Sequence, residues 1–322
     1  MATRRTLLAA GLALPALRSA SAQEVFPNRP ITLVIPWAAG GSTDVMGRVI
    51  AQAMAADLGQ PVVVDNRGGA SGTLGHGHVA RSRPDGYTFL LGTNSTYAIA
   101  PHLIRNLPYD NRAAFTGVSL VARSAQVLCV HPSVPVNSLA EFVAYAKGKP
   151  GEVTYSSAGI GASSHLAAEL FQAKSGTRLL HVPYRGGGPS VQGLLAGEVA
   201  MSFVDMVTCL PFRASGQLKL LGVSTARRSA FANDIPTLAE SGVPGFASST
   251  DVIMLLPAGT PAPIVTRLSA ALQKALQDPA TKERLTTMAV EIIGSSPAEL
   301  DTYWTEELAK WGEIIRSQNI TI

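Results

Sequence analysis

The residues with the clearest chemical potential lie in a glycine-rich loop near the start of the chain. An apolar run, Ile31–Ile35, is followed by Pro36-Trp37-Ala38-Ala39-Gly40-Gly41-Ser42-Thr43-Asp44 and then by a helical pattern up to Met54. No Gly-Lys-Ser/Thr follows, so this is not a Walker A loop, and the G-x-G-x-x-G spacing of a dinucleotide site is missing. The pattern instead predicts a helix N-terminus with free backbone N–H groups, flanked by small residues that leave space for a ligand.

The same arrangement occurs twice more. Val62–Asp65 leads into Asn66-Arg67-Gly68-Gly69-Ala70-Ser71-Gly72-Thr73, and Val153–Ser156 leads into Ser157-Ala158-Gly159-Ile160-Gly161-Ala162-Ser163-Ser164-His165. Free N–H groups and the helix dipole favour an anion at such a terminus by about 0.3–1 kcal/mol. One loop of this kind is usually an ordinary capped βα turn. Three of them predict a cleft that holds carboxylate groups with backbone amides and hydroxyls.

The other polar residues form no catalytic or metal-binding pattern. Asp44 falls in a first helical turn, where the dipole favours an acid. His76 and His78 do not share a helix face and make a poor metal pair. His165 follows two serines, but adjacent helical positions point apart and no G-x-S-x-G motif exists. Arg185 either reaches a carboxylate or is a solvated loop residue. We therefore expect no catalytic residue, no metal and no cofactor.

The elements that must position these loops alternate along the chain. The predicted strands are Ile31–Ile35, Val62–Asp65, Tyr87–Gly92, Thr116–Val121, Gln126–Val130, Val153–Ser156, Leu179–Pro183, Val199–Val204, Lys219–Val223 and Val252–Leu256. Helices are expected to start near Thr43, Thr73, Leu139, Ser163, Pro189, Pro261, Pro279 and Pro297. Capping-box spacing marks two of these starts, at Ser138–Glu141 and Ser296–Glu299. Strand–helix alternation with apolar strands predicts an α/β fold with buried parallel strands.

The alternation is interrupted twice. Near Arg123-Ser124 one strand-like run follows another without a helix, and a second break lies at Gly245–Ser249. We interpret both as crossings between two α/β lobes. The first lobe would hold residues 24–123 plus 249–322, and the second would hold residues 124–248. The cleft between two such lobes is the expected place for a small ligand.

The first 22 residues read as a secretory signal peptide. They combine Arg4-Arg5, a short apolar run and an Ala20-Ser21-Ala22 site, which predicts cleavage after Ala22 and leaves Sec and Tat export open. Removing three arginines leaves 23 basic against 22 acidic residues, a net charge near +1. That balance argues against nucleic-acid binding. No later segment is as apolar as a membrane helix. Cys129 and Cys209 either form a disulfide or remain buried thiols.

Six segments together resemble one known family. They read NRPITLVIPWAAGGSTDVMGR, GQPVVVDNRGGASGTLG, PDGYTFLLGT, SSAGIGASSHLAAELF, LLHVPYRGGGPSVQGLLAGEV and IPTLAESGVPGF. In order, and over essentially the whole mature chain, they are similar to the Bug (TctC-like) receptors of tripartite tricarboxylate transporters. The resemblance implies a two-lobed type II periplasmic-binding-protein fold. It also implies a small carboxylate ligand, clasped by loops from opposite lobes with ordered waters bridging one carboxylate.

The resemblance also indicates which residues of this chain match the ligand-binding positions of the family. Trp37 stands where many members carry Phe, and Ile160 stands where many carry a polar residue, so one family contact is missing. Asp205 matches a position that can meet a ligand amine; it is otherwise a hinge or cap residue. With the repeated loops, the expected ligand-binding residues are Trp37, Gly40, Gly41, Ser42, Thr43, Ala70, Ser71, Ser157, Ala158, Gly161, Ser163, Ser164, His165 and Asp205.

The sequence therefore predicts a monomeric, non-enzymatic periplasmic receptor that delivers a carboxylate to membrane permease subunits. A carboxylate sensor that signals to a membrane partner needs the same fold and is not distinguished by these residues. An enzyme on this fold is supported only by the Ser, His and Asp content of the cleft.

Overall fold

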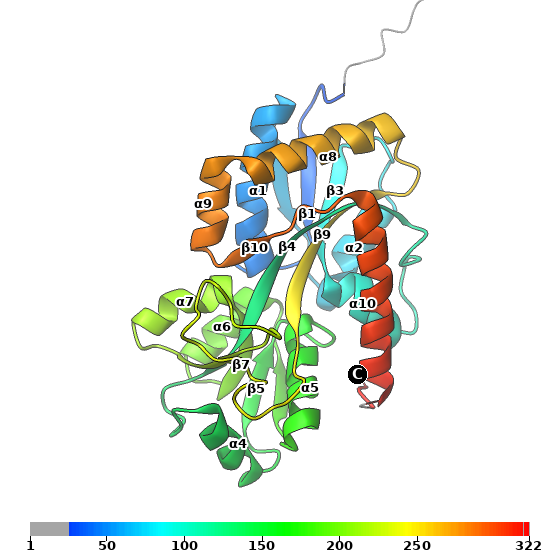
Figure 1. The fold of residues 1–322 in the computed structure, drawn as a ribbon. Coiled ribbons are helices and arrows are strands. Elements are labelled where there is room, and N and C mark those ends of the chain that lie inside the picture. The colour runs from blue at the N-terminus through cyan, green and yellow to red at the C-terminus, as the bar shows by residue number, and fades with distance from the viewer. Residues whose placement is uncertain (1–25, 318, 322) are drawn as a thin grey trace, which may run out of the picture.

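The computed structural model describes residues 26–317 and 319–321, so the predicted signal peptide, residues 1–22, lies outside the described part. Figure 1 shows two lobes, one carrying the blue and orange helices and one coloured mostly green. Within the described residues no helix is long and apolar enough to cross a membrane.

The first lobe is built on a mixed sheet. Its strands follow the order β2-β1-β3-β9-β4, with β10 added beside β4. β1 pairs in parallel with β2 and β3, whereas β9 runs antiparallel to both β3 and β4. The strands are β1 (Ile31–Ile35), β2 (Val62–Asn66), β3 (Thr88–Thr93), β4 (Phe115–Val130), β9 (Ser249–Pro257) and β10 (Val290–Ile292).

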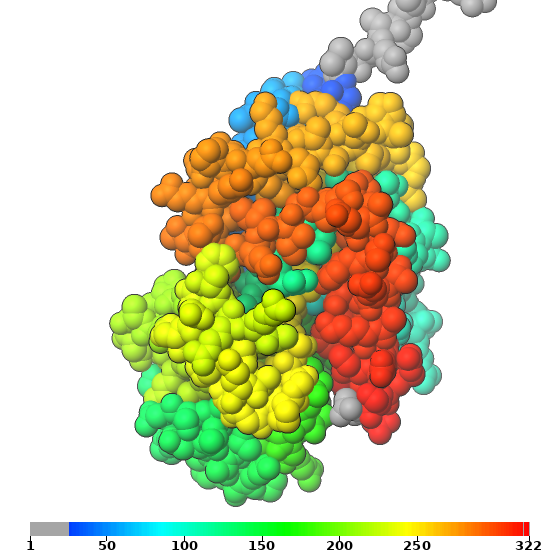
Figure 2. Space-filling view, in the orientation of Figure 1, coloured from blue at the N-terminus to red at the C-terminus, as the bar shows by residue number. Residues whose placement is uncertain are grey.

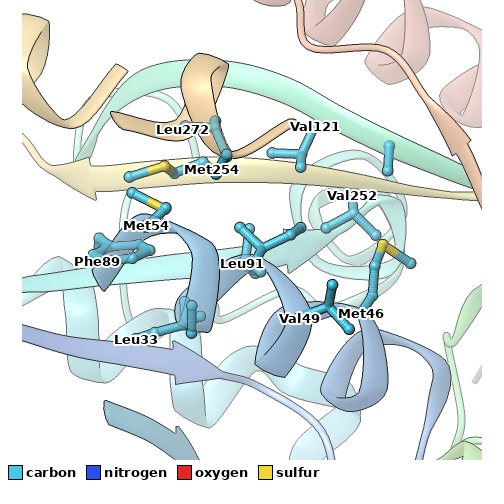
Figure 3. Close-up of a cluster of buried hydrophobic side chains, with 14 of the residues drawn as sticks. Leu33, Met46, Val49, Met54, Phe89, Leu91, Val121, Val252, Met254 and Leu272 are labelled. Carbon is cyan, nitrogen blue, oxygen red and sulfur yellow. The ribbon is translucent and has the colours of Figure 1, made fainter. Parts of the chain in front are cut away.

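Helices cover both faces of this sheet. One face carries α1 (Ser42–Leu58), α8 (Ala262–Gln277) and α9 (Pro279–Thr287). On the other lie α2 (Thr73–Ala80), a short π-helix η2 (Ser95–Ile99), α3 (Ala100–Leu103) and α10 (Pro297–Ser317), with a single 3₁₀ turn η1 (Ala70–Gly72) before α2. Figure 3 shows the hydrophobic core between the sheet and the helices α1, α8 and α9, where Met46 and Val49 of α1 lie beside Leu91 of β3. Both faces of β1, β3 and β9 are buried, which explains their largely apolar sequences.

The second lobe repeats this plan on a smaller scale. Its strand order is β4-β7-β5-β6, with β8 also paired to β4. β5 is parallel to β6 and β7. The elements are β5 (Thr154–Ser157), β6 (Leu180–Pro183), β7 (Met201–Asp205), β8 (Lys219–Val223), α4 (Leu139–Lys147), α5 (Ser163–Ser175), α6 (Gly187–Leu195) and α7 (Met206–Ala214).

Strand β4 belongs to both lobes. Residues 115–125 pair with β9, and residues 126–130 pair with β7. The expectation of two separate strands, Thr116–Val121 and Gln126–Val130, is therefore wrong: a single strand runs through, with register shifts beyond Gly117 and Leu120 that the pattern does not reveal. The lobe limits at residues 123/124 and 248/249 remain predictions.

Most other predicted elements are confirmed within a few residues. Both serines cap their helices: Ser138 Oγ accepts the Glu141 N–H at 3.2 Å, and Ser296 Oγ accepts the Glu299 N–H at 3.3 Å. The box is reciprocal at Ser296, whose N–H donates to Glu299, whereas Glu141 accepts the N–H of Asn137. The prediction missed β10, α7, α3 and η2. Cys129 and Cys209 are buried free thiols, and burial raises the pKa of Cys129.

Helix α2 packs directly on the two glycine-rich loops of the first lobe. A Cβ on Gly75 would lie 2.9 Å from Pro36 Cα and 2.9 Å from the Arg67 carbonyl oxygen. Both contacts are with backbone, so neither can move aside without shifting a loop. On the same helix, a Cβ on Gly77 would meet only the flexible guanidinium of Arg81, at 3.2 Å, and Pro108.

These two glycines should respond differently to alanine. Overpacking a buried contact costs about 1–3 kcal/mol, whereas Gly→Ala inside a helix gains up to about 1 kcal/mol. We expect Gly75→Ala to lower the free energy of unfolding by about 1–2 kcal/mol, and Gly77→Ala to leave it unchanged or raise it. Urea denaturation of both variants measures this. Equal effects would show that α2 can move away from the loops.

Candidate ligand-binding site

A cavity lies between the lobes at the carboxyl ends of strands from both sheets, where α/β folds place their ligands. It encloses about 50 Å³ of space open to water-sized molecules. The loops after β1, β3, β5 and β6, and the end of β7, all reach it. Its lining consists of Trp37, Gly41, Ser42, Thr43, Thr93, Ser95, Gln126, Ala158, Ala162, Ser163, Ser164, Gly187, Ser190, Val191, Phe203, Val204, Asp205, Thr208 and Thr250.

The structure brings together eight of the fourteen predicted residues in this lining: Trp37, Gly41, Ser42, Thr43, Ala158, Ser163, Ser164 and Asp205. Gly40, Ala70, Ser71, Ser157, Gly161 and His165 lie outside it. Sequence reasoning missed Ser95, Gln126 and Thr250. Ser95 could have been predicted from the sequence, because it follows the end of β3 closely. Gln126 and Thr250 reach the cavity only through the pairing of β4 with its neighbours.

Asp205, at the end of β7, joins the lobes by hydrogen bonds. Its Oδ1 accepts from Thr250 Oγ1 at 2.6 Å, and its Oδ2 accepts from Ser42 Oγ. Ser163 Oγ lies 3.1 Å from Thr250 Oγ1, and Gln126 Nε2 lies 3.3 Å from each of these hydroxyls. Since Thr250 donates its one proton to Asp205, Ser163 must donate to Thr250. The polar groups of the cavity thus form a chain of donors that ends at Asp205.

The charge of the cavity is unusual for an anion site. Asp205 is its one acidic residue, and the lining contains no lysine, arginine or histidine. Burial raises the pKa of Asp205 above 3.8, and the nearby charge of Asp251 acts in the same direction, against the two hydroxyl donors. Positive potential at this cavity therefore comes from backbone groups such as the N-termini of α1, α5 and α6, each of which places its first residue in the lining.

The loop between β1 and α1 is held by an acid outside the cavity. Gly40 adopts φ +81° and donates its N–H to Asp44 Oδ2 at 2.9 Å. Burial opposes the ionisation of Asp44, but hydrogen bonds from Arg48, Gly40 and Asn66 hold its pKa below the usual value. Asp44 is thus a structural residue of the first helical turn, as its position in the sequence suggested.

Backbone contacts bring the lobes together beside the cavity. A Cβ on Gly188 would lie 3.3 Å from the Ala39 carbonyl oxygen and 3.6 Å from the Gly41 nitrogen. Ser71 Oγ donates to the Ile160 carbonyl across the cleft. Ser95 Oγ of the first lobe accepts the Ser163 N–H at 2.8 Å. The cleft is therefore closed in this structure. The Ser163 N–H has Ser95 Oγ as its acceptor and does not point freely into the cavity.

A second hollow, of about 620 Å³, lies between residues 225–231 and α10 on the face of the molecule that Figure 2 shows. It carries more charge, but three of its four lysine and arginine side chains pair with neighbouring acids: Arg123 with Asp251, Arg228 with Glu240 and Lys310 with Glu307. We place the ligand site in the smaller cavity, because the strand ends and helix N-termini of both lobes converge there.

The histidines offer no metal site. His76 is buried, its Nε2 lies 2.8 Å from Thr96 Oγ1, and burial lowers its pKa to about 3. His78 lies instead 3.2 Å from Arg67 Nη1. Within residues 26–317 and 319–321 no group of three His, Cys, Asp or Glu side chains is arranged to hold a metal ion.

Comparison with known proteins identifies the family. The family model described as tripartite tricarboxylate transporter family receptor matches residues 46–320. The chain belongs to this family. The receptor is 35% identical to protein BugT of Bordetella pertussis over 308 residues, which cover 95% of this chain and 93% of BugT. Members of the family are periplasmic solute-binding proteins.

Two solved structures with ligands resemble the receptor along most of its length. Rpa4515 of R. palustris with adipate has a TM-score of 0.89 at 34% identity, covering 92% of this chain and 99% of Rpa4515. MatC (Rpa3494) of Rhodopseudomonas palustris with bound malate has a TM-score of 0.86 at 32% identity, covering 90% of this chain and all of MatC (100%). The predicted two-lobed periplasmic-binding-protein fold and the predicted family are confirmed.

Asp205 makes the stability of the ligand-free receptor depend on pH. Because its folded pKa is raised, its favourable contribution is complete below 3.8 and is lost as the pH rises through the folded value. Asn cannot ionise, so Asp205→Asn should gain stability relative to the native protein between pH 4 and pH 7, by about 1.4 kcal/mol per unit of pKa shift. Urea unfolding at both pH values measures the change. A constant difference between the two proteins would contradict it.

Proposed function

We propose that this receptor captures a small organic carboxylate in the cavity between its lobes and delivers it to membrane permease subunits. The protein would act as a monomer in the periplasm, with its signal peptide cleaved near Ala22. The observation that carries the proposal is the convergence of two helix N-termini, from opposite lobes, on one cavity rich in hydroxyl groups. Rpa4515 with adipate and MatC with malate support a carboxylate as the ligand.

The carboxylate would lie between the first turns of α1 and α5. Ser42 and Thr43 belong to the first turn of α1, and Ser163 and Ser164 to that of α5. The first N–H groups of a helix have no intrahelical partner, so they can donate to an anion together with these hydroxyls. The Gly161 and Ser163 N–H groups donate to His165 and Ser95 in this structure. The N–H groups at the start of α1 would therefore donate to the ligand first. The Ser163 N–H would donate to the ligand after its hydrogen bond to Ser95 breaks.

Asp205 would select the other end of the ligand. A carboxylate that faces the cavity repels a second anion and accepts from a donor, so the group opposite Asp205 would be an amine or a hydroxyl. Ser42 and Thr250 now fill this role with their hydroxyls. The alternative of a hinge residue is compatible with this role, because Asp205 would join the lobes until a ligand arrives. The alternative of a helix cap has no support, since the Asp205 side chain accepts no N–H from α7.

Ligand exchange would require the lobes, residues 24–123 plus 249–322 and residues 124–248, to separate. The chain would bend near Arg123 in β4 and at residues 245–249 before β9, because these are the two places where it passes from one proposed lobe to the other. Catalysis is not part of the proposal: Ser163 donates to Thr250, and no histidine lines the cavity. Binding and release are thus the only chemistry that these groups support.

The anion requirement can be tested directly. A thermal-shift screen of organic acids identifies a ligand, because a ligand that binds only the folded state raises its stability. It begins with malate, which has a hydroxyl to face Asp205, and with adipate, which has none. Isothermal titration then compares that acid with its neutral amide. We expect the amide to bind at least tenfold more weakly, since a hydrogen bond to a charged group contributes about 1.5–3 kcal/mol.

Two variants locate the anion in the same assay. Ser42→Ala should weaken binding about tenfold, while backbone donors survive. Gly161→Val should weaken it more, because Gly161 has φ +82° and a β-branched residue is strained there. Ser82→Ala, whose hydroxyl bonds the His78 carbonyl away from the cavity, is the control. Equal affinity for the acid and the amide would end the carboxylate proposal, whatever the variants did.

Closure can be tested at the backbone contact beside the cavity. Gly188→Val would push a side chain into Ala39 and Gly40, so we expect the ligand-saturated variant to keep a larger radius of gyration than the native receptor. Gly148→Val is the matched control, because a Cβ on Gly148 would lie 3.5 Å from the Tyr145 carbonyl oxygen, within the second lobe. Small-angle scattering measures both. Identical compaction in all three proteins would refute closure through this contact.

A further inference from the structure

The loop between β5 and α5, residues 158–162, owes its shape to side chains that accept its N–H groups. Ala158 donates to Ser164 Oγ at 3.0 Å, Gly159 to Ser157 Oγ at 3.2 Å, and Gly161 to His165 Nδ1 at 3.1 Å. Gly159 and Gly161 have φ +132° and +82°, so neither a helix nor a strand continues through the loop. Its backbone forms one turn, in which the Ala162 N–H donates to the Gly159 carbonyl at 3.1 Å, and the side-chain acceptors add to that turn. Both ends of the loop, Ala158 and Ala162, line the cavity.

His165 and His181 form a stacked pair behind this loop. Their ring centroids are 4.2 Å apart with an interplanar angle of 13°, and His181 stacks on Tyr155 at 4.7 Å on its other side. His165 is 5% exposed. His181 Nε2 lies 2.6 Å from Ser157 Oγ, and Ser157 also contacts the Gly159 carbonyl at 3.1 Å. The pair therefore supports the loop at Gly161 and at Ser157.

The proton arrangement of His165 follows from its partner. A backbone N–H can only donate, so Nδ1 of His165 must accept from Gly161, and the ring proton must sit on Nε2. That nitrogen faces Glu169 Oε1 at 3.7 Å, too far for a hydrogen bond. A doubly protonated ring would turn an N–H toward the Gly161 N–H and would break the contact.

The surroundings keep both rings neutral. Burial lowers the pKa of His165 and of His181 to about 4 each; at His181 the charge of His165 acts in the same direction and that of Glu169 opposes it. The other titratable groups that face the pair are Tyr155 and Glu169, and the Tyr155 hydroxyl donates to Glu169 Oε1 at 2.6 Å. Because the folded pKa values lie below 6.5, the stability of this arrangement is complete above 6.5 and is lost as the pH falls toward 4.

We propose that His165, backed by His181, is a positioning residue for ligand binding: its neutral Nδ1 holds the Gly161 N–H and so sets the shape of the loop that closes on the ligand. The proposal rests on the proposed function for its effect on affinity, but not for its effect on the loop. His165 does not line the cavity, so it acts through the backbone and not by touching the ligand.

The test separates the acceptor atom from the bulk of the ring. His165→Asn places an amide oxygen where Nδ1 lies, whereas His165→Leu retains bulk without an acceptor. We expect His165→Leu to bind adipate or malate at least tenfold more weakly than the native receptor, and His165→Asn to remain within about threefold. His131→Leu, at a second-lobe histidine outside the cavity lining, should bind normally.

Amide hydrogen exchange of the peptide covering residues 157–165 gives a readout that needs no ligand. Protection should fall in His165→Leu and be retained in His165→Asn. Equal protection in the two variants, or equal affinity for a probe that the native receptor binds, would overturn the positioning role. If the native receptor binds none of the organic acids, the proposed function fails, and the exchange comparison still decides the role of His165.

Discussion

The arrangement of the whole molecule depends on the backbone hydrogen bonds of one strand. β4 pairs with β9 and β10 in the first lobe and with β7 and β8 in the second, so the two sheets share a continuous polypeptide. At the crossing, Arg123 Nε contacts Asp251 Oδ1 at 2.5 Å, and Tyr303 of α10 donates to the same carboxylate at 2.6 Å. Burial opposes the charge of Arg123, but Asp251 raises its pKa overall. This junction brings Gln126 and Thr250 beside Asp205.

The cavity proposed to bind a carboxylate is lined by no cationic side chain. Its polar groups are hydroxyls, one amide and one carboxylate, and they satisfy one another when no ligand is present. A lysine or arginine in this space would attract many anions through a charge that acts over several ångströms. Helix termini and hydroxyls act within one turn or one hydrogen bond. Such groups favour ligands of the right shape over ligands that are merely charged.

The sequence revealed the parts of the fold that depend on local patterns. Strands such as Ile31–Ile35 and Lys219–Val223 were predicted with their observed limits, because apolar runs end at clear turn signals. Helix α7 was missed because Pro211 lies inside it, and the three-residue β10 has no pattern of its own. The glycine-rich loops located seven lining residues, and the family resemblance added Asp205. Gln126 and Thr250 could not be found, since their positions depend on strand register across 124 residues of chain.

The contact between Gly188 and the Ala39–Gly41 backbone has a consequence for how such receptors diversify and can be engineered. The proposed closure would use main-chain atoms at this point, whereas the cavity is shaped by side chains such as Trp37, Val191 and Phe203. This backbone contact can therefore be kept while the side chains of the cavity walls change. Substituting the cavity walls would retarget the protein to another metabolite without rebuilding its motion. That separation makes the scaffold suitable for a fluorescent biosensor, with one dye on each lobe reporting the same movement for any cargo.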